Sequence, residues 1–296
     1  MAALAALVNK AVPDDKSIIL FYNTGNAQLG LAFQSGTSTD DQPKDIWEPR
    51  DDDYNGYILN PSSISAAYYR GLNYVAAVTM PKLEEGATQT VNQISLVSPI
   101  YLKLTTTTLN NTNVALCVTP DGNDGWLYHI SGQSSTDRIL KEMDLNTGNT
   151  QDNRILNVAS NASVTAFYDS DSKKRHIIYE GGNILEYIVQ DKQTINVPSP
   201  TMAVNPAIAA AYSPSNKKTY LFYTDKDLFI WRVTKDQYGW SPAGAVVAGA
   251  PQIAEMSKLT LVQANGINHL FYIAKDFGGA KVKAWSDFTH VRNPID

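Results

Sequence analysis

Ile208-Ala209-Ala210-Ala211-Tyr212 is one of six short apolar runs, rich in small residues, that recur along the chain. The first residues of successive runs are 60, 50, 50, 44 and 51 positions apart. A period of about 50 residues with strand-like content is typical of the blades of a β-propeller. Because Ala and Ser let strands crowd around an axis, we expect each run to be the innermost strand of a blade. The six runs are Leu4–Leu7, Ile64–Tyr68, Val114–Cys117, Val164–Phe167, Ile208–Tyr212 and Leu259–Val262.

The segments after these runs predict the rest of each blade. A second apolar stretch ending in Tyr follows a polar turn, and a third follows a turn of Gly, Asn and Asp residues, which favour tight turns. We therefore predict an all-β, six-bladed β-propeller with four-stranded antiparallel blades, forming one domain over residues 1–296. The expected second strands are Ile18–Tyr22, Ile177–Tyr179, Tyr220–Tyr223 and Leu270–Tyr272, and the expected third strands are Leu29–Phe33, Ile184–Val189 and Leu228–Val233.

Composition and charge exclude several classes of protein. No apolar run reaches the roughly 18 residues that a membrane span needs, so we expect a soluble protein. The net charge is −5 and the arginines are scattered, which argues against a nucleic-acid partner. The only cysteine, Cys117, cannot form an internal disulfide and is expected to be buried. Glycosylation motifs begin at Asn110 and Asn161, and a removed leader would fit secretion, but the compartment stays open.

Signatures of covalent or metal chemistry are missing from the sequence. It contains no G-x-S-x-G, P-loop or G-x-G-x-x-G motif, so covalent hydrolysis is not indicated. Asp51, Asp53 and Asn55 match the first half of a calcium loop, but Ser62 stands where the bidentate Glu belongs, which favours a solvated acidic turn. The histidines lie far apart, so no zinc site is predicted and no cofactor is expected.

Two long polar segments interrupt the blade rhythm, 35–61 and 80–92. Long excursions that carry aromatic residues often cover or line a binding site. The first contains Trp47, which we expect either to contact substrate or to pack on its own blade.

The stretch His176–Tyr187, which reads HIIYEGGNILEY, resembles the six-bladed fungal fucose-binding lectin family. In that family a sugar site combines an Arg on the second strand, a Glu on the third strand and a nearby aromatic residue. The Arg and Glu hold sugar hydroxyls through charge-assisted hydrogen bonds, and the aromatic ring stacks on the apolar face of the sugar. The resemblance places Glu186 at the glutamate position and His176 at the arginine position.

The other blades offer no matching pair at these positions. In the next blade we expect Tyr220 and Ile230 at the arginine and glutamate positions, and in the sixth blade Asn268 at the arginine position. The resemblance therefore implies a lectin-like scaffold from which the sugar sites have been lost.

The chain is also similar to a second branch with this scaffold, the fungal hetero-Diels–Alderases of tropolone sesquiterpenoid biosynthesis. That resemblance implies a small-molecule enzyme of secondary metabolism. The tropolone quinone methide would form by loss of water from a hydroxymethyl tropolone and would then join a humulene-type alkene. Such a pericyclase needs an apolar pocket that holds both hydrophobic substrates in a near-attack pose, together with donors for the tropolone oxygens.

Candidate site residues follow from that requirement. Arg70 is the first choice of hydrogen-bond donor, although a blade cap or a surface ion pair would equally explain it. His129 and His176 could instead be satisfied sheet histidines, and Arg232 an exposed neighbour of a buried Trp231. The expected catalytic residues are Arg70, His129, Tyr69 and Tyr168, and the expected substrate-binding residues are Trp47, Tyr68, Trp126, His176, Trp231 and Arg232.

Three functions from different classes remain open at this point. A pericyclase predicts one deep, mainly apolar pocket, and its partners would be small hydrophobic molecules. A degenerate carbohydrate-binding lectin predicts shallow pockets between blades, with one retained site around His176, Glu186 and Tyr187. The third is a non-catalytic interaction propeller. A homodimer is compatible with all three.

Overall fold

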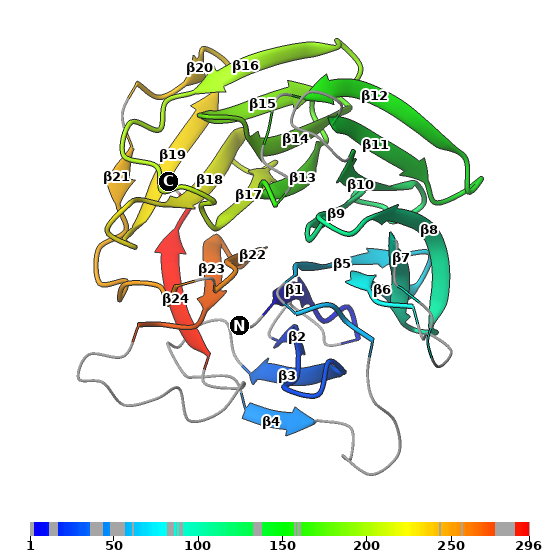
Figure 1. Ribbon diagram of the computed structural model, residues 1–296. Helices are drawn as coiled ribbons and strands as arrows, with labels where there is room; N and C mark the ends of the chain where they lie inside the picture. The colour runs from blue at the N-terminus through cyan, green and yellow to red at the C-terminus, as the bar shows by residue number, and fades with distance from the viewer. Residues whose placement is uncertain are drawn as a thin grey trace.

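The protein is seen in a computed structural model, which describes residues 3–11, 17–35, 44–47, 57–60, 62–81, 86, 88, 91–132, 138–156, 158, 161–242, 244–255, 257–275 and 288–295. Within these ranges all regular elements are β-strands, and they form six antiparallel sheets arranged in a ring (Figure 1). The predicted all-β, six-bladed propeller is confirmed.

The blades are numbered in chain order. Blade 1 contains β1 (Leu4–Val8), β2 (Ser17–Asn23), β3 (Leu29–Ser35) and β4 (Lys44–Trp47); blade 2 contains β5 (Ile64–Tyr69), β6 (Leu72–Thr79), β7 (Val91–Ser98) and β8 (Leu102–Thr108). Blade 3 contains β9 (Val114–Val118), β10 (Gly125–Ser131), β11 (Arg138–Asp144) and β12 (Thr150–Leu156); blade 4 contains β13 (Val164–Asp169), β14 (Lys174–Glu180), β15 (Ile184–Ile188) and β16 (Gln193–Val197). Blade 5 contains β17 (Ile208–Ser213), β18 (Lys218–Thr224), β19 (Ile230–Asp236), β20 (Gly239–Trp240) and β21 (Ala245–Val246); blade 6 contains β22 (Thr260–Ala264), β23 (Ile267–Tyr272) and β24 (Thr289–Pro294).

The six apolar runs of the sequence form or border the innermost strands. Within each sheet the strands follow one another outward in chain order, starting from β1, β5, β9, β13, β17 and β22. Each of these strands contacts the innermost strand of the next blade, and β22 contacts β1. The contact between β22 and β1 closes the ring around a central axis (Figure 1).

Blade 5 departs from the predicted pattern in its third strand. That strand begins at Ile230 rather than at Leu228, which lies in the preceding turn with φ of +67°. The Oδ1 atom of Asp225 accepts the backbone N–H groups of Asp227 and Phe229, at 2.9 and 2.8 Å, and so fixes a longer turn than the sequence suggested. Both β20 and β21 pair with β19, which makes this sheet five-stranded.

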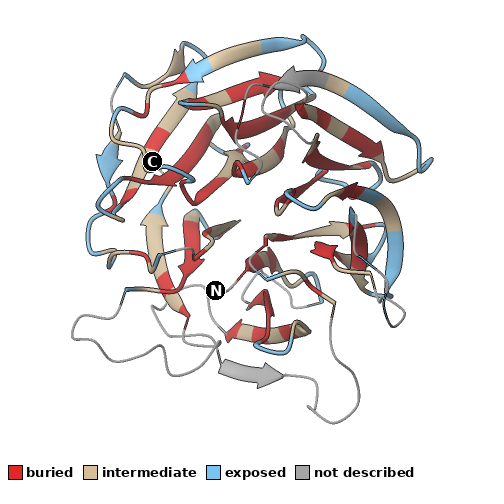
Figure 2. Ribbon diagram, viewed as in Figure 1, coloured by how far each residue is buried: buried red, intermediate tan, exposed pale blue. Residues whose placement is uncertain are grey.

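The hydrophobic core lies mainly between blades. Each of six clusters of buried apolar side chains joins two neighbouring blades, so that every interface around the ring has its own cluster. Figure 2 shows the buried residues concentrated on the inner and middle strands. Apolar burial between blades is thus what holds the ring together.

Gly30 is a position where this packing leaves no room for a side chain. It pairs with Tyr22 across β2 and β3, and a Cβ atom at Gly30 would lie 2.4 Å from Cζ of the fully buried Tyr22 ring. We predict that Gly30→Ala lowers the free energy of unfolding by about 1–3 kcal/mol, as overpacked core positions do. Urea denaturation measures this effect. In a Tyr22→Leu background the alanine should cost less, and an equal cost in both backgrounds would contradict the steric explanation.

Candidate functional site

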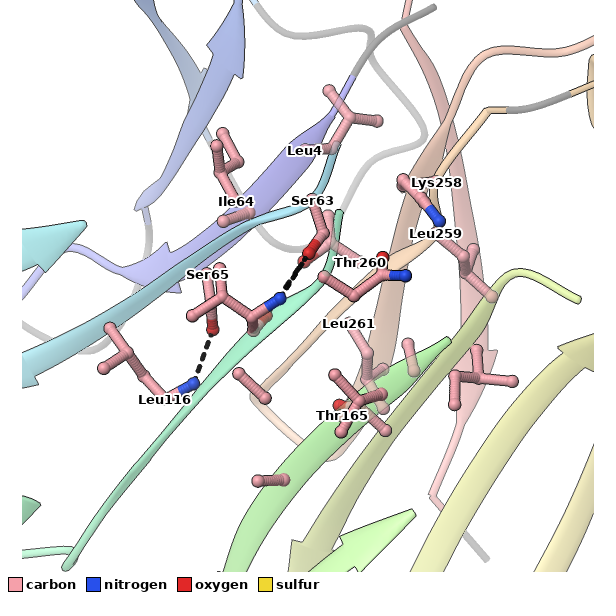
Figure 3. Close-up of a pocket in the computed structure, with 18 of the residues that line it drawn as sticks. Leu4, Ser63, Ile64, Ser65, Leu116, Thr165, Lys258, Leu259, Thr260 and Leu261 are labelled. Carbon is pink, nitrogen blue, oxygen red and sulfur yellow. Dashed lines mark hydrogen bonds between the residues drawn. The ribbon is translucent and has the colours of Figure 1, made fainter. Parts of the chain in front are cut away.

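A passage of about 130 Å³ runs along the axis of the ring and is lined by the innermost strands of all six blades (Figure 3). Hydroxyl groups bridge neighbouring strands along its wall. Ser63 and Ser65 accept the backbone N–H groups of Val114 and Leu116 at 2.8 and 2.9 Å, and Thr260 accepts that of Ala6 at 3.1 Å. Each innermost strand is the edge of its sheet, so some of its backbone N–H groups have no neighbouring strand to pair with. The hydroxyls accept hydrogen bonds from these N–H groups. Ser63, Ser65 and Thr260 therefore have a structural role.

At the C-terminal ends of the innermost strands, the passage meets a cavity of about 320 Å³ that we call the aromatic cup. Its aromatic wall includes Tyr68, Tyr168 and Tyr212, which each lie four positions after the first residue of their run. The cup and the passage share Leu116, Ala166 and Ala210. It is lined by Lys10, Ala67, Tyr68, Leu116, Cys117, Val118, Thr119, Pro120, Ala166, Phe167, Tyr168, Ala210, Ala211 and Tyr212.

The hydroxyl groups of the cup are suited to donate hydrogen bonds. Burial raises the pKa of Tyr168, and burial together with the charge of Asp169 raises the pKa of Tyr212. Both phenols therefore stay protonated at neutral pH. The sequence analysis included Tyr68 and Tyr168 among its site residues but missed Tyr212, which their shared position relative to the run would have revealed.

Glu186, the carboxylate expected in a retained sugar site, is fully buried and already fully engaged. Nδ1 of His176 donates to its Oε1 atom at 2.7 Å, and Nζ of Lys235 contacts both carboxylate oxygens at 2.8 Å. The indole N–H of Trp240 donates to Oε2 at 2.8 Å. Burial alone would raise the pKa of Glu186, but the hydrogen bond from His176 and the charge of Lys235 outweigh it and lower that pKa. Because Lys235 and Trp240 belong to blade 5, this cluster links blades 4 and 5.

Glu142 occupies the same position in blade 3, and the sequence analysis missed it. It pairs with Tyr128 as Glu186 pairs with Ile178, and Tyr128 and Ile178 are equivalent positions of the second strand. Nη1 of Arg175, on β14 of blade 4, donates to its Oε1 atom at 2.6 Å. The Arg175 guanidinium lies 4.4 Å from the ring centroid of Trp126. The Arg, Glu and aromatic residues thus come from two adjacent blades.

Strand pairing corrects two assignments made from the sequence. In blade 5 the residue equivalent to Glu186 is Arg232, which pairs with Phe222, and not Ile230. In blade 6 the second-strand residue equivalent to His176 is His269, which pairs with Val262, and not Asn268. Both errors arise because the hairpin loops differ in length from blade to blade.

The expected aromatic substrate-binding residues lie at three separate places. Trp126 stacks on Tyr168 at 6.4 Å between ring centroids, so it extends the wall of the cup outward. Trp231 donates its indole N–H to Asp225 at 2.7 Å, and Arg232 donates to Asn293 of blade 6 at 3.0 Å. Trp47 lies in β4, but its side chain is outside the described part of the chain.

The remaining catalytic candidates do not line the passage or the cup. Arg70 is exposed in the turn between β5 and β6, with φ of +48°, and lies 5.3 Å from the ring centroid of Tyr69. Tyr69 is buried and donates its hydroxyl to Asn146. His129 is buried within blade 3, where burial lowers its pKa to about 4. The structure brings together only Tyr68, Tyr168 and, beside them, Trp126.

No group of three metal-ligating side chains occurs among the residues that the structure describes. The partial calcium motif Asp51, Asp53 and Asn55 lies outside those residues. No helix in the described ranges is long and apolar enough to cross a membrane.

Comparisons with solved structures support the fold. No family model matches the sequence. Two proteins named wall-associated proteinase, from Coccidioides immitis (strain RS) and Coccidioides posadasii (strain RMSCC 757 / Silveira), are each 24% identical to the chain, over 97% of its length and 96% of theirs. Among solved structures, a triple arginine-to-alanine mutant of AofleA from Arthrobotrys oligospora superposes with a TM-score of 0.67 at 11% identity, over 99% of this chain and 88% of that one. The six-bladed fucose-recognising lectin of Aleuria aurantia superposes with a TM-score of 0.64 at 11% identity, over 99% and 96%. The fold is therefore that of a lectin-like propeller.

Proposed function

We propose that this protein is a hetero-Diels–Alderase, a pericyclase of fungal secondary metabolism that uses the aromatic cup to join a tropolone quinone methide to a humulene-type alkene. The observation that carries the proposal is the cup itself, where Tyr68, Tyr168 and Tyr212 converge beside small apolar residues. Its volume of about 320 Å³ lies at the lower end of the range of roughly 300–1,000 Å³ that is typical of small-molecule sites.

The cup offers aromatic walls and a hydrogen-bond donor that a cycloaddition could use. Aromatic rings and the methyl groups of Ala166 and Ala210 can hold two hydrophobic reactants in contact, which lowers the entropic barrier of a bimolecular step. The Tyr168 hydroxyl can donate to a tropolone oxygen and draw electron density from the diene, whereas the Tyr212 hydroxyl already donates to the carboxylates of Asp169 and Asp171. The same Tyr168 donor favours the loss of water that generates the quinone methide.

Tyr168→Phe tests the proposed donor while keeping the ring. We predict that this variant lowers kcat about 10-fold for a hydroxymethyl tropolone and a humulene-type alkene, since one hydrogen bond to the reacting system contributes about 1–1.5 kcal/mol. Product formation and stereochemistry are measured by chiral chromatography with mass detection. Tyr238→Phe is the matched control, because Tyr238 is 89% exposed and does not line the cup.

Two results would refute the pericyclase proposal. One is wild-type protein that gives no acceleration and no stereochemical preference over buffer. The other is wild-type activity in Tyr168→Phe together with wild-type activity in Tyr168→Ala, which would show that the reaction does not use the cup.

A carbohydrate-binding function is the second candidate, and the cluster of Glu142, Arg175 and Trp126 favours it. These are the residue types of a lectin sugar site, and Arg175 retains 13% exposure of its side chain. The carboxylate of Glu142, however, also accepts side-chain N–H groups from Gln151 and Asn153, at 2.7 and 3.1 Å, which leaves few acceptor positions for a sugar. Glycan-array binding that is lost in Trp126→Ala would favour this candidate over the pericyclase.

We also infer a secreted location, which the wall-associated name of the Coccidioides relatives supports.

A further inference from the structure

Lys258 occupies a distinctive place at the end of the axial passage opposite the aromatic cup. It lines the passage and also a cavity of about 380 Å³, the mouth cavity, formed by segments that precede the innermost strands and by the turn after β18. Figure 3 shows Lys258 among the residues around the passage. Much of the wall of the mouth cavity is apolar, with Val204, Leu228 and Ile253 among its residues. An amine therefore borders an apolar cavity large enough for a small organic molecule.

Glu180, at the end of β14, is the acid whose negative charge acts on the pKa of this amine. Glu180 is 7% exposed, and its Oε1 atom accepts the backbone N–H of Asn205, another residue of the mouth cavity, at 3.0 Å. Its Oε2 atom is buried and has no hydrogen-bond partner among the described residues. A buried carboxyl oxygen without a partner is costly when it is charged, and it is better tolerated when it carries a proton.

The surroundings of both groups shift them towards their neutral forms. Burial lowers the pKa of Lys258 even though the negative charge of Glu180 opposes that change. Burial likewise raises the pKa of Glu180 against the hydrogen bond from Asn205. A neutral amine is a nucleophile, and a protonated carboxyl group can act as its general acid.

We propose that Lys258 is a nucleophilic amine that forms an imine with a small, mainly apolar aldehyde or ketone held in the mouth cavity, with Glu180 as the proton donor. The amine nitrogen attacks the carbonyl carbon, and one proton passes from the nitrogen to the carbonyl oxygen to give a carbinolamine. Glu180 protonates the hydroxyl group, which leaves as water while the C=N bond forms. The proton that remains on the iminium nitrogen then passes to the Glu180 carboxylate, so the net change is the release of one water.

Reductive trapping tests this site directly. The full-length protein is incubated with benzaldehyde and sodium cyanoborohydride at pH 7, and the N-benzylated peptides are quantified by mass spectrometry. We expect Lys258 to be labelled several-fold faster than Lys226, since a lower pKa gives a larger neutral fraction of the amine. Lys226 is the internal reference because it is exposed in the turn after β18.

Variants separate the site from general lysine reactivity. Lys258→Arg should remove the fast labelling, whereas Lys226→Arg should leave it unchanged. Glu180→Gln should slow labelling at Lys258 and leave labelling at Lys226 as it was. The proposal is overturned if Lys258 in wild-type protein is labelled no faster than Lys226, or if Glu180→Gln has no effect on Lys258. Since the trapping reaction does not involve the aromatic cup, its outcome is independent of the cycloaddition assay.

Discussion

Replacing Glu186 by alanine is expected to lower the free energy of unfolding by about 3–5 kcal/mol, because it removes one partner of a buried ion pair and leaves the other uncompensated. The carboxylate is fully buried and accepts from His176, Lys235 and Trp240. Without it, the Lys235 ammonium, whose side chain is only 18% exposed, loses its counter-ion. The loss of stability should arise at the interface between blades 4 and 5, because Glu186 lies on blade 4 and Lys235 on blade 5.

Urea denaturation of the wild type and the variant at pH 7 measures this loss. Glu255→Ala is the matched control, since Glu255 is exposed and its removal should change stability by less than about 0.5 kcal/mol. Glu186→Gln should fall between the two, because the amide oxygen still accepts one hydrogen bond but no longer neutralises Lys235. A loss below about 1 kcal/mol in Glu186→Ala would contradict the account of a buried inter-blade cluster.

The same cluster predicts how stability falls in acid. The pKa of Glu186 is lower in the folded state than in the unfolded chain. Its contribution is therefore complete above the unfolded pKa and is lost as the pH falls through the folded value. Fucose binding through Glu186 is not expected at any pH, because its oxygens are already occupied by protein donors.

The architecture could be predicted from the sequence because one local pattern repeats at every blade. The runs at 4–7, 64–68, 114–117, 164–167, 208–212 and 259–262 all lie on or border the innermost strands, since only small or apolar residues can pack around the axis. The position of Tyr212 beside Tyr68 and Tyr168 was also available from the sequence, as the fifth residue of a run.

The inter-blade clusters could not be found in this way. Which third-strand residue lies beside a given second-strand residue depends on the length of the hairpin between them, and this length varies. Ile178 pairs with Glu186, 8 positions later, but Tyr128 pairs with Glu142, 14 positions later. A fixed spacing therefore identifies Glu186 and misses Glu142. Partners from the next blade, such as Arg175 and Lys235, depend on tertiary packing and leave no local signal.

His129 should make the protein less stable as the pH falls from 6.5 towards 4. It is 1% exposed, and neither ring nitrogen has a hydrogen-bond partner among the described residues. Burial, with a smaller effect from the Lys141 charge and an opposing one from Asp152, lowers its pKa to about 4. Between that value and about 6.5 the unfolded chain binds a proton that the folded protein does not. The free energy of unfolding therefore decreases as the pH decreases.

The expected size of this effect is about 2 kcal/mol between pH 6.5 and pH 5, and about 3 kcal/mol down to pH 4, at 1.36 kcal/mol for each pH unit. The first interval isolates His129 from Glu186, whose contribution is lost only at lower pH. In blades 4 and 5 the equivalent position holds Tyr179 and Tyr223, which pair with the first residue of the innermost strand as His129 pairs with Val114.

His129→Tyr and His129→Leu therefore test the prediction with residues that cannot titrate in this range. Urea denaturation at pH 7 and pH 5 gives the loss of stability for each protein. The loss in the wild type should exceed the loss in both variants by about 2 kcal/mol, whatever the other histidines contribute, because they are common to all three proteins. Equal losses in the wild type and the variants would show that His129 is protonated in the folded state at pH 5. That result would contradict the lowered pKa of His129 and its lack of hydrogen-bond partners in blade 3.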